Sequence, residues 1–287
     1  MHKHQYINAL TNKNLLLRIN SLTLPQISIY QLFKLKDITM FNIGNTIKFI
    51  RKTDSTNKYT IKYIAENEVE SGTVFLAYEQ TDGKGHMNNR WESEAGMNLT
   101  FSIFLKPDFI TVYQQYMISK IVCLGIKHFL DRFINEAVTI KWPNDIYVGT
   151  RKICGILIEN TVMDNQICYS IAGIGLNINQ MSFSQSLPNP VSLKMITGKD
   201  HKTEELLSLL LNDIDHFYEL LKTGKNTDID TSFEQSLYLF KTIGLFKDAN
   251  HEFYGTIKGV NDIGQLMIEE KNGTVNFYHF KEVVYIH

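Results

Sequence analysis

The chain has 287 residues, of which 44% are hydrophobic and 21% are charged, and its formal net charge at pH 7 is −1. These values are typical of a globular protein, and the near-neutral charge gives no reason to expect nucleic acid as the main partner. The longest apolar stretch, around residues 117–130, is interrupted by Lys120, Lys127 and His128, so we expect no membrane helix.

The cysteines argue against a disulfide framework. Cys123, Cys154 and Cys168 are odd in number, and their spacing does not resemble that of a metal site. We therefore expect reduced cysteines in a cytoplasmic protein. None of the three stands in a recognisable cysteine–histidine arrangement, so core packing is their simplest role. We identify no metal ligands from spacing alone.

Residues 1–40 differ in composition from the rest of the chain. They hold five Lys or Arg residues but a single acidic residue, Asp37. They lack the compact apolar region and small-residue cleavage site of a secretory signal. We expect an N-terminal extension that is either poorly ordered or the result of a misassigned start, with Met40 as the alternative first residue. The extension looks too short for a winged helix-turn-helix domain.

From residue 41 onward, strands alternate with helices. Apolar, β-prone segments predict strands at 46–50, 73–79 and 98–105, and helical spacing of apolar residues predicts helices at 54–68 and 112–133. Four more strands and a helical stretch are expected after these, at 138–141, 145–148, 152–160, 166–177 and 203–240. Clustered strands beside long helices predict an α+β fold, with a mixed β-sheet and helices on one face.

The last part of the chain has a different sequence pattern. Alternating segments predict strands at 252–260, 265–270 and 274–279, and Asn272-Gly273 is a strong hairpin-turn signal. We expect a small β-barrel packed on the main domain, because a unit of this size is only marginally stable alone. The predicted organisation is an extension (1–40), a main domain (41–243) and a C-terminal barrel (244–287).

The most informative segment contains Lys141, Asn144, Asp145 and Lys152 within twelve positions. Two ammonium groups, an amide and a carboxylate can together hold a phosphate, a metal ion and a carboxylate substrate. This combination indicates activation of a carboxylic acid by a nucleotide. A plainer interpretation stays open, in which Asn144 and Asp145 form an ordinary turn and Lys152 is a solvated lysine at a strand edge.

Three other segments have the composition of binding sites. Residues 80–91 form a glycine-containing basic loop that matches neither a P-loop nor a dinucleotide fingerprint, and it could be a solvated loop. Residues 53–57 could cap a helix or hydrogen-bond a small polar ligand. Glycines in residues 173–179 predict a close backbone approach, or a bulge followed by a polar turn.

Taken in order, these segments resemble the biotin–acetyl-CoA-carboxylase ligases, or biotin protein ligases. The resemblance rests on Ser-Thr-Asn at 55–57, Gln-Thr-x-Gly-x-Gly at 80–85, Lys-Trp-Pro-Asn-Asp at 141–145, Lys-x-x-Gly-Ile-Leu at 152–157 and Gly-Ile-Gly-x-Asn-x-Asn at 173–179. It extends over about residues 45–287. It implies a main sheet like that of class II aminoacyl-tRNA synthetases and an SH3-like C-terminal barrel. It also implies that residues 41–243 are the catalytic domain.

The resemblance implies a two-step reaction. Biotin and ATP, with Mg²⁺, would give biotinyl-5′-AMP, and the biotinyl group would then pass to a lysine of a biotin carboxyl carrier domain. Lys152, Lys84 and Asp145 would be catalytic. The residues implied at biotin are Ser55, Thr56, Asn57, Gln80, Lys84 and Lys152. The residues implied at the nucleotide are Arg90, Trp91, Lys141, Asn144 and Asn177.

This sequence departs from the family pattern in the basic loop. Lys84, His86 and Asn89 stand where the family has arginines, and Asn88 replaces a glycine, with Arg90 as a partial compensation. A lysine cannot form the bidentate contact of an arginine, so retention of the intermediate is in question. The alternatives are a lipoate ligase or octanoyl transferase and a non-enzymatic biotin-binding regulator. We expect a monofunctional ligase without repressor activity.

Overall fold

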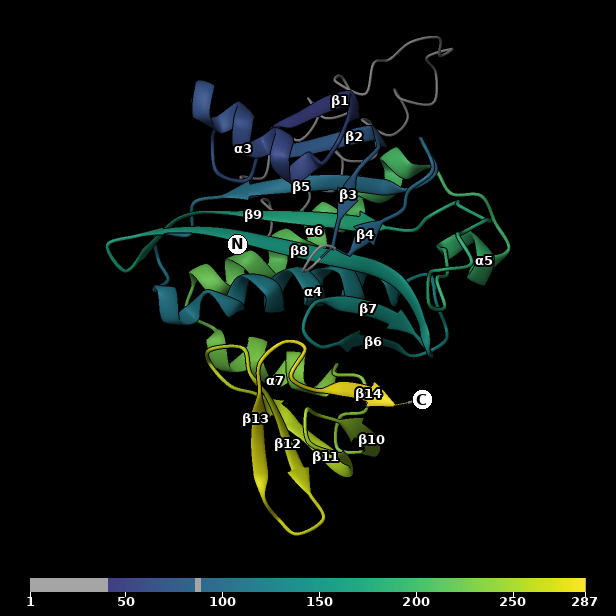
Figure 1. Ribbon diagram of the computed structural model, residues 1–287. Helices are drawn as coiled ribbons and strands as arrows, with labels where there is room; N and C mark the ends of the chain where they lie inside the picture. The colour runs from purple at the N-terminus through teal and green to yellow at the C-terminus, as the bar shows by residue number, and fades with distance from the viewer. Residues whose placement is uncertain (1–40, 86–88, 287) are drawn as a thin grey trace, which may run out of the picture. The chain divides into compact units, whose positions relative to one another are not determined.

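The computed structural model describes residues 41–85 and 89–286, and Figure 1 shows their arrangement. The strands are β1 (Ile47–Thr53), β2 (Val74–Gln80), β3 (Gly83–Lys84), β4 (Arg90–Trp91), β5 (Leu99–Leu105), β6 (Val138–Lys141), β7 (Asp145–Val148), β8 (Arg151–Met163), β9 (Gln166–Leu176), β10 (Ile243–Lys247), β11 (Glu252–Val260), β12 (Leu266–Glu270), β13 (Val275–Tyr278) and β14 (Val284–Ile286). The helices are α3 (Thr56–Glu66), η3 (Val112–Gln114), α4 (Tyr116–Leu130), α5 (Leu193–Thr197), α6 (Thr203–Lys222) and α7 (Asn226–Gln235).

The main sheet has seven strands in the order β1-β2-β5-β9-β8-β7-β6. β1 pairs with β2 in parallel, and the remaining neighbours are antiparallel. Strands β6 to β9 follow one another in the chain and lie side by side, because short turns suffice for antiparallel neighbours. Every residue of β5 is buried, so both faces of the sheet centre are covered.

Helix α3 and the two long helices, α4 and α6, cover opposite faces of the main sheet. In β5, Phe101 and Ile103 belong to the large core that includes α4 and α6, whereas Phe104 belongs to a small cluster beside α3. Successive residues of a strand point to opposite faces, so the two clusters lie on the two sides of the sheet. The long helices α4 and α6 therefore share one face, and α3 covers part of the other (Figure 1).

Two predicted helices differ from the observed ones. The helix expected at 112–133 consists of the single 3-10 turn η3 followed by α4. The stretch expected at 203–240 is divided into α6 and α7. The division falls at Gly224, whose φ of +75° is a left-handed conformation that ends an α-helix.

The C-terminal sheet has five antiparallel strands in the order β13-β12-β11-β10-β14. Its buried residues, such as Phe246 and Ile257, join the same core as the main sheet. Gly273 has a φ of +84° in the turn between β12 and β13, as its place in the predicted hairpin requires. Trp142, just after β6, donates an indole hydrogen bond of 2.9 Å to the carbonyl of Gly264. The domain boundary at 243/244 stays a prediction.

The start of the described chain is attached to α6. The carboxylate of Asp215 accepts hydrogen bonds from the backbone N–H groups of Asn42 and Ile43, at 2.8 and 2.9 Å. Burial raises the pKa of Asp215, while these two hydrogen bonds act in the opposite direction. The predicted extension, residues 1–40, lies outside the described residues. None of the helices in the described part of the chain combines the length and apolar character needed to cross a bilayer.

Candidate functional site

A cavity of about 350 Å³ opens beside the β7–β9 part of the main sheet. It is lined by all of the predicted site residues except Asn177: Ser55, Thr56, Asn57, Gln80, Lys84, Arg90, Trp91, Lys141, Asn144, Asp145 and Lys152. These residues come from α3, the strands β2 to β8 and the turns between them. The structure therefore brings together side chains that are separated by almost one hundred positions in the sequence.

Glycines form one wall of the cavity where β8 and β9 pair. A Cβ atom at Gly175 would lie 2.3 Å from the indole of Trp91, and one at Gly173 would lie 2.4 Å from the amide oxygen of Asn57. Gly155, the neighbour of Gly175 in the ladder, also faces the Trp91 ring, at 3.0 Å. The close approach predicted for this glycine segment is thus an approach to Trp91 and Asn57. Because the glycines have no side chains, Trp91 and Asn57 lie directly against the sheet.

Asn57 is buried, and its amide is fully engaged by the protein. Its oxygen accepts a 2.6 Å hydrogen bond from the Ser102 hydroxyl. Its NH₂ group donates to the carboxylate of Glu159 at 2.7 Å and to the carbonyl of Leu157 at 3.2 Å. This amide therefore fixes the first turn of α3 on the sheet, and Asn57 shapes the cavity wall.

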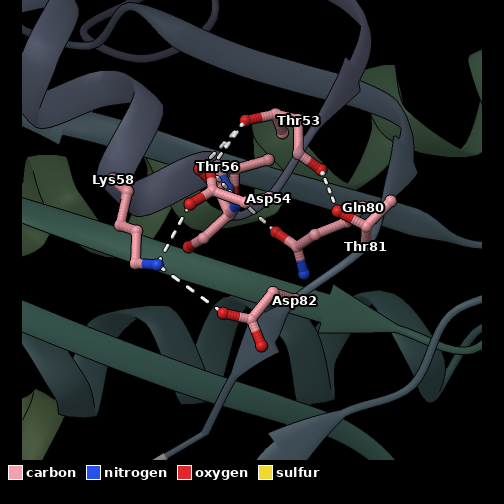
Figure 2. Close-up of polar contacts among 8 residues, drawn as sticks. Thr53, Asp54, Thr56, Lys58, Gln80, Thr81 and Asp82 are labelled. Carbon is pink, nitrogen blue, oxygen red and sulfur yellow. Dashed lines mark hydrogen bonds and ion pairs between the residues drawn. The ribbon is translucent and has the colours of Figure 1, made fainter.

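The N-terminus of α3 is held by Gln80, whose side-chain oxygen accepts the Thr56 N–H at 2.8 Å. Ser55 occupies the N-cap position, but its side chain makes no capping hydrogen bond. The predicted cap by residues 54–55 is therefore replaced by a side chain from β2. Figure 2 shows the side chain of Gln80 beside Thr56 at the start of α3.

An ionic cluster connects the same helix turn to the loop after β2. The Lys58 ammonium lies 3.0 Å from the Asp54 carboxylate and 3.6 Å from that of Asp82 (Figure 2). The hydrogen bond from Lys58 is the main cause of the lowered pKa of Asp54. The backbone N–H of Thr81 also donates to the carbonyl of Thr53, at 3.0 Å. These contacts fix the point where the basic loop leaves the sheet.

Lys152 and Asp145 form an ion pair of 2.7 Å in the cavity. Lys152 stands opposite Tyr147 in the β7–β8 ladder, two residues along β7 from Asp145, so the two side chains lie on the same face of the sheet. The Lys152 ammonium also lies 5.7 Å from the centre of the Trp91 ring. Both partners of the pair are only partly exposed, so their charges are less screened than at an open surface.

Lys141 is surrounded by tyrosines. Its ammonium lies 4.9 Å from the ring centres of Tyr147 and Tyr285 and 5.9 Å from that of Tyr238. These three residues are called the tyrosine cluster below. Burial lowers the pKa of Lys141, the charge of Lys152 lowers it further, and Asp145 opposes both effects. The position is therefore one where an added anion would stabilise the charged form of the lysine.

The two asparagines implied at the nucleotide have different surroundings. The Asn144 side chain donates to the carbonyl of Ile156, and this contact joins the turn before β7 to β8. Asn177 is buried and does not line the cavity, and its NH₂ group donates to the carbonyl of Val191 at 3.1 Å. Asn144 therefore lines the cavity, whereas Asn177 does not.

The basic loop contributes Lys84 and Arg90, which oppose each other in the short ladder of β3 and β4. Both side chains are exposed and line the cavity, as does Asn89. His86 and Asn88, two of the departures from the family pattern, lie outside the described residues. The ladder places the indole of Trp91, opposite Gly83, at the root of this loop.

Several cavity residues were not predicted. The segment between β13 and β14, with β14 itself, contributes Phe280, Lys281, Val283, Val284 and Tyr285. No motif marks these positions, and only the docking of the C-terminal sheet brings them to the site. Tyr147 was also missed, although it lies two residues after Asp145 in β7.

The charges in the cavity are unequal. Among the described residues, Asp145 is the only acidic side chain that lines it, against the basic Lys84, Arg90, Lys141, Lys152 and Lys281. Clefts lined by one sign of charge attract ligands of the opposite sign. No group of three or more His, Cys, Asp or Glu side chains that could hold a metal occurs in residues 41–85 and 89–286. The excess of basic side chains therefore suits the cavity to an anionic ligand.

Comparisons with known proteins show which proteins the chain is similar to. The model of the biotin/lipoate A/B protein ligase family matches residues 49–177. The chain is 28% identical over 227 residues to the bifunctional ligase/repressor BirA of Bacillus spizizenii, in an alignment covering 78% of this chain and 70% of that protein. It is 25% identical over 243 residues to BirA of Escherichia coli, covering 84% and 74% of the two chains.

The fold of the chain is similar to that of a solved structure. Biotin protein ligase from Aquifex aeolicus, in complex with biotin and ATP, superposes with a TM-score of 0.69 at 24% identity, covering 85% of this chain and 99% of that one. Together with the two sheets and their helices, this likeness confirms the predicted α+β fold class.

Proposed function

We propose that this chain, whose residues 49–177 match the model of the biotin/lipoate A/B protein ligase family, is an ATP-dependent biotin protein ligase. In this proposal it joins biotin to AMP and then transfers the biotinyl group to a lysine of a biotin carboxyl carrier domain. The observation that carries the proposal is the Lys152–Asp145 ion pair, which lies in a strongly basic cavity between the start of α3 and the tyrosine cluster.

The α3 end of the cavity is proposed to hold the biotin ring system. Ser55, Thr56 and Gln80 offer a hydroxyl pair and an amide at a helix N-terminus, where backbone N–H groups also point outward. Asn57, whose own amide is engaged, keeps this end rigid. Such a set of neutral donors and acceptors suits the uncharged, polar ureido group of biotin.

The opposite end is proposed to hold the nucleotide. Trp91 offers an aromatic face, Arg90 and Lys141 offer positive charge, and Asn144 also lines the cavity. Asn177 would act only through the wall of the site, since it does not reach the cavity.

Lys152 is proposed to act where the two substrates meet. A carboxylate oxygen of biotin forms a bond to the α-phosphorus of ATP, and the bond from that phosphorus to pyrophosphate breaks. Both reacting groups are anionic, and a fixed ammonium reduces their repulsion most as charge develops in the transition state. Asp145 orients Lys152 through the 2.7 Å ion pair. Lys84 lies beside the biotin carboxylate in this arrangement.

The second step consumes the mixed anhydride. The neutral amine of the carrier lysine attacks the acyl carbon, the new amide bond forms, and AMP leaves with the electrons of the broken acyl–oxygen bond. The cations that neutralise the α-phosphate also favour departure of AMP.

Mg²⁺ is proposed to enter with ATP. Magnesium in nucleotide sites is usually held by substrate phosphates and one or two carboxylates. Asp145 is the one carboxylate that the described cavity lining offers, and it is already paired with Lys152. Asp145 is the residue that would hold such an ion, which would neutralise charge on the phosphates.

The cysteines argue against an acyl transfer through a thiol. Cys154 is buried, and burial raises the pKa of its thiol far above the usual value. Burial has the same effect on Cys123. A nucleophilic cysteine needs accessible thiolate, so the octanoyl transferase alternative loses support. The three free cysteines support a reducing, cytoplasmic setting.

The test is direct detection of the intermediate. The protein is incubated with ATP and Mg²⁺, with either biotin or lipoate, and the products are identified by mass. Biotinyl-AMP formed with biotin alone supports the proposal. Lipoyl-AMP formed in preference would assign the chain to the lipoate branch, and biotin binding without any adenylate would make it a non-enzymatic binder. Addition of a biotin carboxyl carrier domain then tests the transfer to lysine.

A further inference from the structure

The last strand of the chain reaches into the basic cavity, and its Tyr285 has an unusual environment. The Tyr285 ring lies 4.9 Å from the Lys141 ammonium and packs on Phe246 and Tyr238, with ring centres 5.3 and 5.9 Å away. The contact joins the C-terminal sheet to the strand that carries the Lys-Trp-Pro-Asn-Asp motif. No motif or comparison gives Tyr285 a role.

The hydroxyl of Tyr285 does not explain why a tyrosine stands here. Its oxygen is buried and has no hydrogen-bond partner among the described residues. Burial of an unpaired hydroxyl is unfavourable, so the contribution of this residue must come from its ring. The aromatic face attracts a cation placed over it, and more strongly where water is excluded.

We propose that Tyr285 is a positioning residue, whose ring holds the Lys141 ammonium at the nucleotide end of the cavity and thereby couples the C-terminal sheet to ATP use. This inference rests on the proposed function for the identity of the ligand. Tyr285 does not contact substrate in this proposal; it acts through Lys141, together with Tyr147 and Tyr238.

The charges around Lys141 explain why it needs to be held. Asp145 attracts its ammonium and Lys152 repels it, and burial lowers the pKa of Lys141. Without an aromatic face on the side of the C-terminal sheet, the lysine would be free to turn toward the Asp145 carboxylate, which already pairs with Lys152. The tyrosine cluster attracts the ammonium without neutralising its charge, so a positive charge remains at the nucleotide end of the cavity.

The test compares two variants of Tyr285 with a matched control. Tyr285→Leu removes the ring, whereas Tyr285→Phe keeps the ring and removes only the unpaired hydroxyl. Tyr278→Leu is the control, because Tyr278 is another tyrosine of the C-terminal sheet but packs on Phe253 and does not line the cavity. Tyr285→Met, which is apolar and flexible, replaces the leucine variant if that one does not fold.

The readouts are the KM for ATP, the KM for biotin and the equilibrium binding of a non-hydrolysable ATP analogue. We expect Tyr285→Leu to weaken both ATP parameters by roughly three- to tenfold and to leave the KM for biotin within about twofold. Tyr285→Phe and Tyr278→Leu should stay within about twofold of the unmodified protein in every parameter. In a Lys141→Gln background, Tyr285→Leu should have no further effect on ATP binding.

Three outcomes would overturn the inference. The first is equal loss of ATP and biotin affinity in Tyr285→Leu, and the second is the same loss in Tyr278→Leu. The third is a phenylalanine variant as defective as the leucine variant, which would assign the role to the hydroxyl. If the unmodified protein binds the ATP analogue but forms no biotinyl-AMP, the proposed function is wrong. The comparison of ATP-analogue binding among the variants then still decides the role of Tyr285.

Discussion

Lys152 is the residue on which the proposed chemistry depends most. We expect Lys152→Ala to lower pyrophosphate release by about 10²–10³-fold at saturating biotin and ATP, because one charge-stabilising contact in a transition state is typically worth that factor. Lys152→Arg should restore little, since a planar guanidinium fits the position of a point charge badly. Pyrophosphate release and a melting curve are measured together.

Lys194 provides a matched control for this variant. It has the same side-chain exposure as Lys152, 29%, and the same ion-pair distance of 2.7 Å, to Asp200, but it does not line the cavity. Lys194→Ala should release pyrophosphate at the unmodified rate. Near-normal release by Lys152→Ala, with both variants folded, would remove Lys152 from the mechanism.

The glycines in the cavity wall predict substitutions with effects of different size. A methyl group at Gly175 would lie 2.3 Å from the Trp91 ring, and one at Gly155 would lie 3.0 Å away. The first forces the indole off the sheet, whereas the second requires a shift of only a few tenths of an ångström. We expect Gly175→Ala to raise the KM for ATP by about tenfold over the unmodified protein, for an indole contact worth roughly 0.5–1.5 kcal/mol, and Gly155→Ala to raise it less. Steady-state kinetics check the order, and a larger effect of Gly155→Ala would contradict it.

At the scale of elements, α4 and α7 are joined by one asymmetric ion pair. The Lys120 ammonium lies 2.7 Å from the Asp230 carboxylate, and the lysine side chain is 3% exposed while the aspartate is 37% exposed. Removal of the aspartate leaves a buried charge, whereas removal of the lysine leaves a carboxylate that water can reach.

We therefore expect the two single variants to differ. Asp230→Ala should lower the free energy of unfolding by roughly 1.5–3 kcal/mol, the range for a charged hydrogen bond. Lys120→Met, which keeps an unbranched apolar chain between the Tyr116 and Phe233 rings, should cost less than about 1.5 kcal/mol. Denaturant unfolding measures both, and a reversed order would show that the Lys120 charge is solvated.

Element boundaries were predictable where the local pattern is unambiguous. Strands β6 and β7 begin and end as predicted, because their alternation is interrupted only by the turn at Pro143 and Asn144. The division between α6 and α7 was missed, since a single Gly224 inside a helical pattern does not reveal its left-handed conformation. Strands β10 and β14 were missed, and their pairing with each other depends on docking of distant segments.

The site also contains residues that a local pattern predicts and residues that only distant packing brings together. Lys141, Asp145 and Lys152 come together because β6, β7 and β8 are consecutive antiparallel strands, which the sequence pattern predicts. Tyr285 reaches Lys141 only through the packing of the C-terminal sheet, for which the chain offers no local signal. The position of Asn177 behind the cavity wall depends on its contact with Val191, which is equally unpredictable from spacing.

At the scale of the whole molecule, the need for residues 1–39 can be tested by shortening the chain. A chain that begins at Met40 is expected to fold and ligate normally, because it keeps the cavity residues and the hydrogen bonds from Asn42 and Ile43 to Asp215. A chain that begins at Asn45 should be less stable by roughly 2–4 kcal/mol. It loses the buried Ile43 side chain and the hydrogen bonds to the buried Asp215 carboxylate.

Thermal unfolding and biotinyl-AMP formation are measured on both shortened chains. Full stability of the chain from Asn45 would show that the Asp215 contacts are dispensable. Loss of folding or activity in the chain from Met40 would mean that residues 1–39 belong to the catalytic fold.

The central strand β5 has a consequence for how the chain is made. Both faces of β5 are buried, and one of its edges pairs with β9, so that Leu99 stands opposite Leu176. A ribosome releases β5 long before it has translated β9, and the nascent strand meanwhile carries an apolar surface and an unpaired edge. Such edges are prone to pair with other chains. Biosynthesis of this protein therefore passes through a stage at which a chaperone that shields apolar strands would raise the yield.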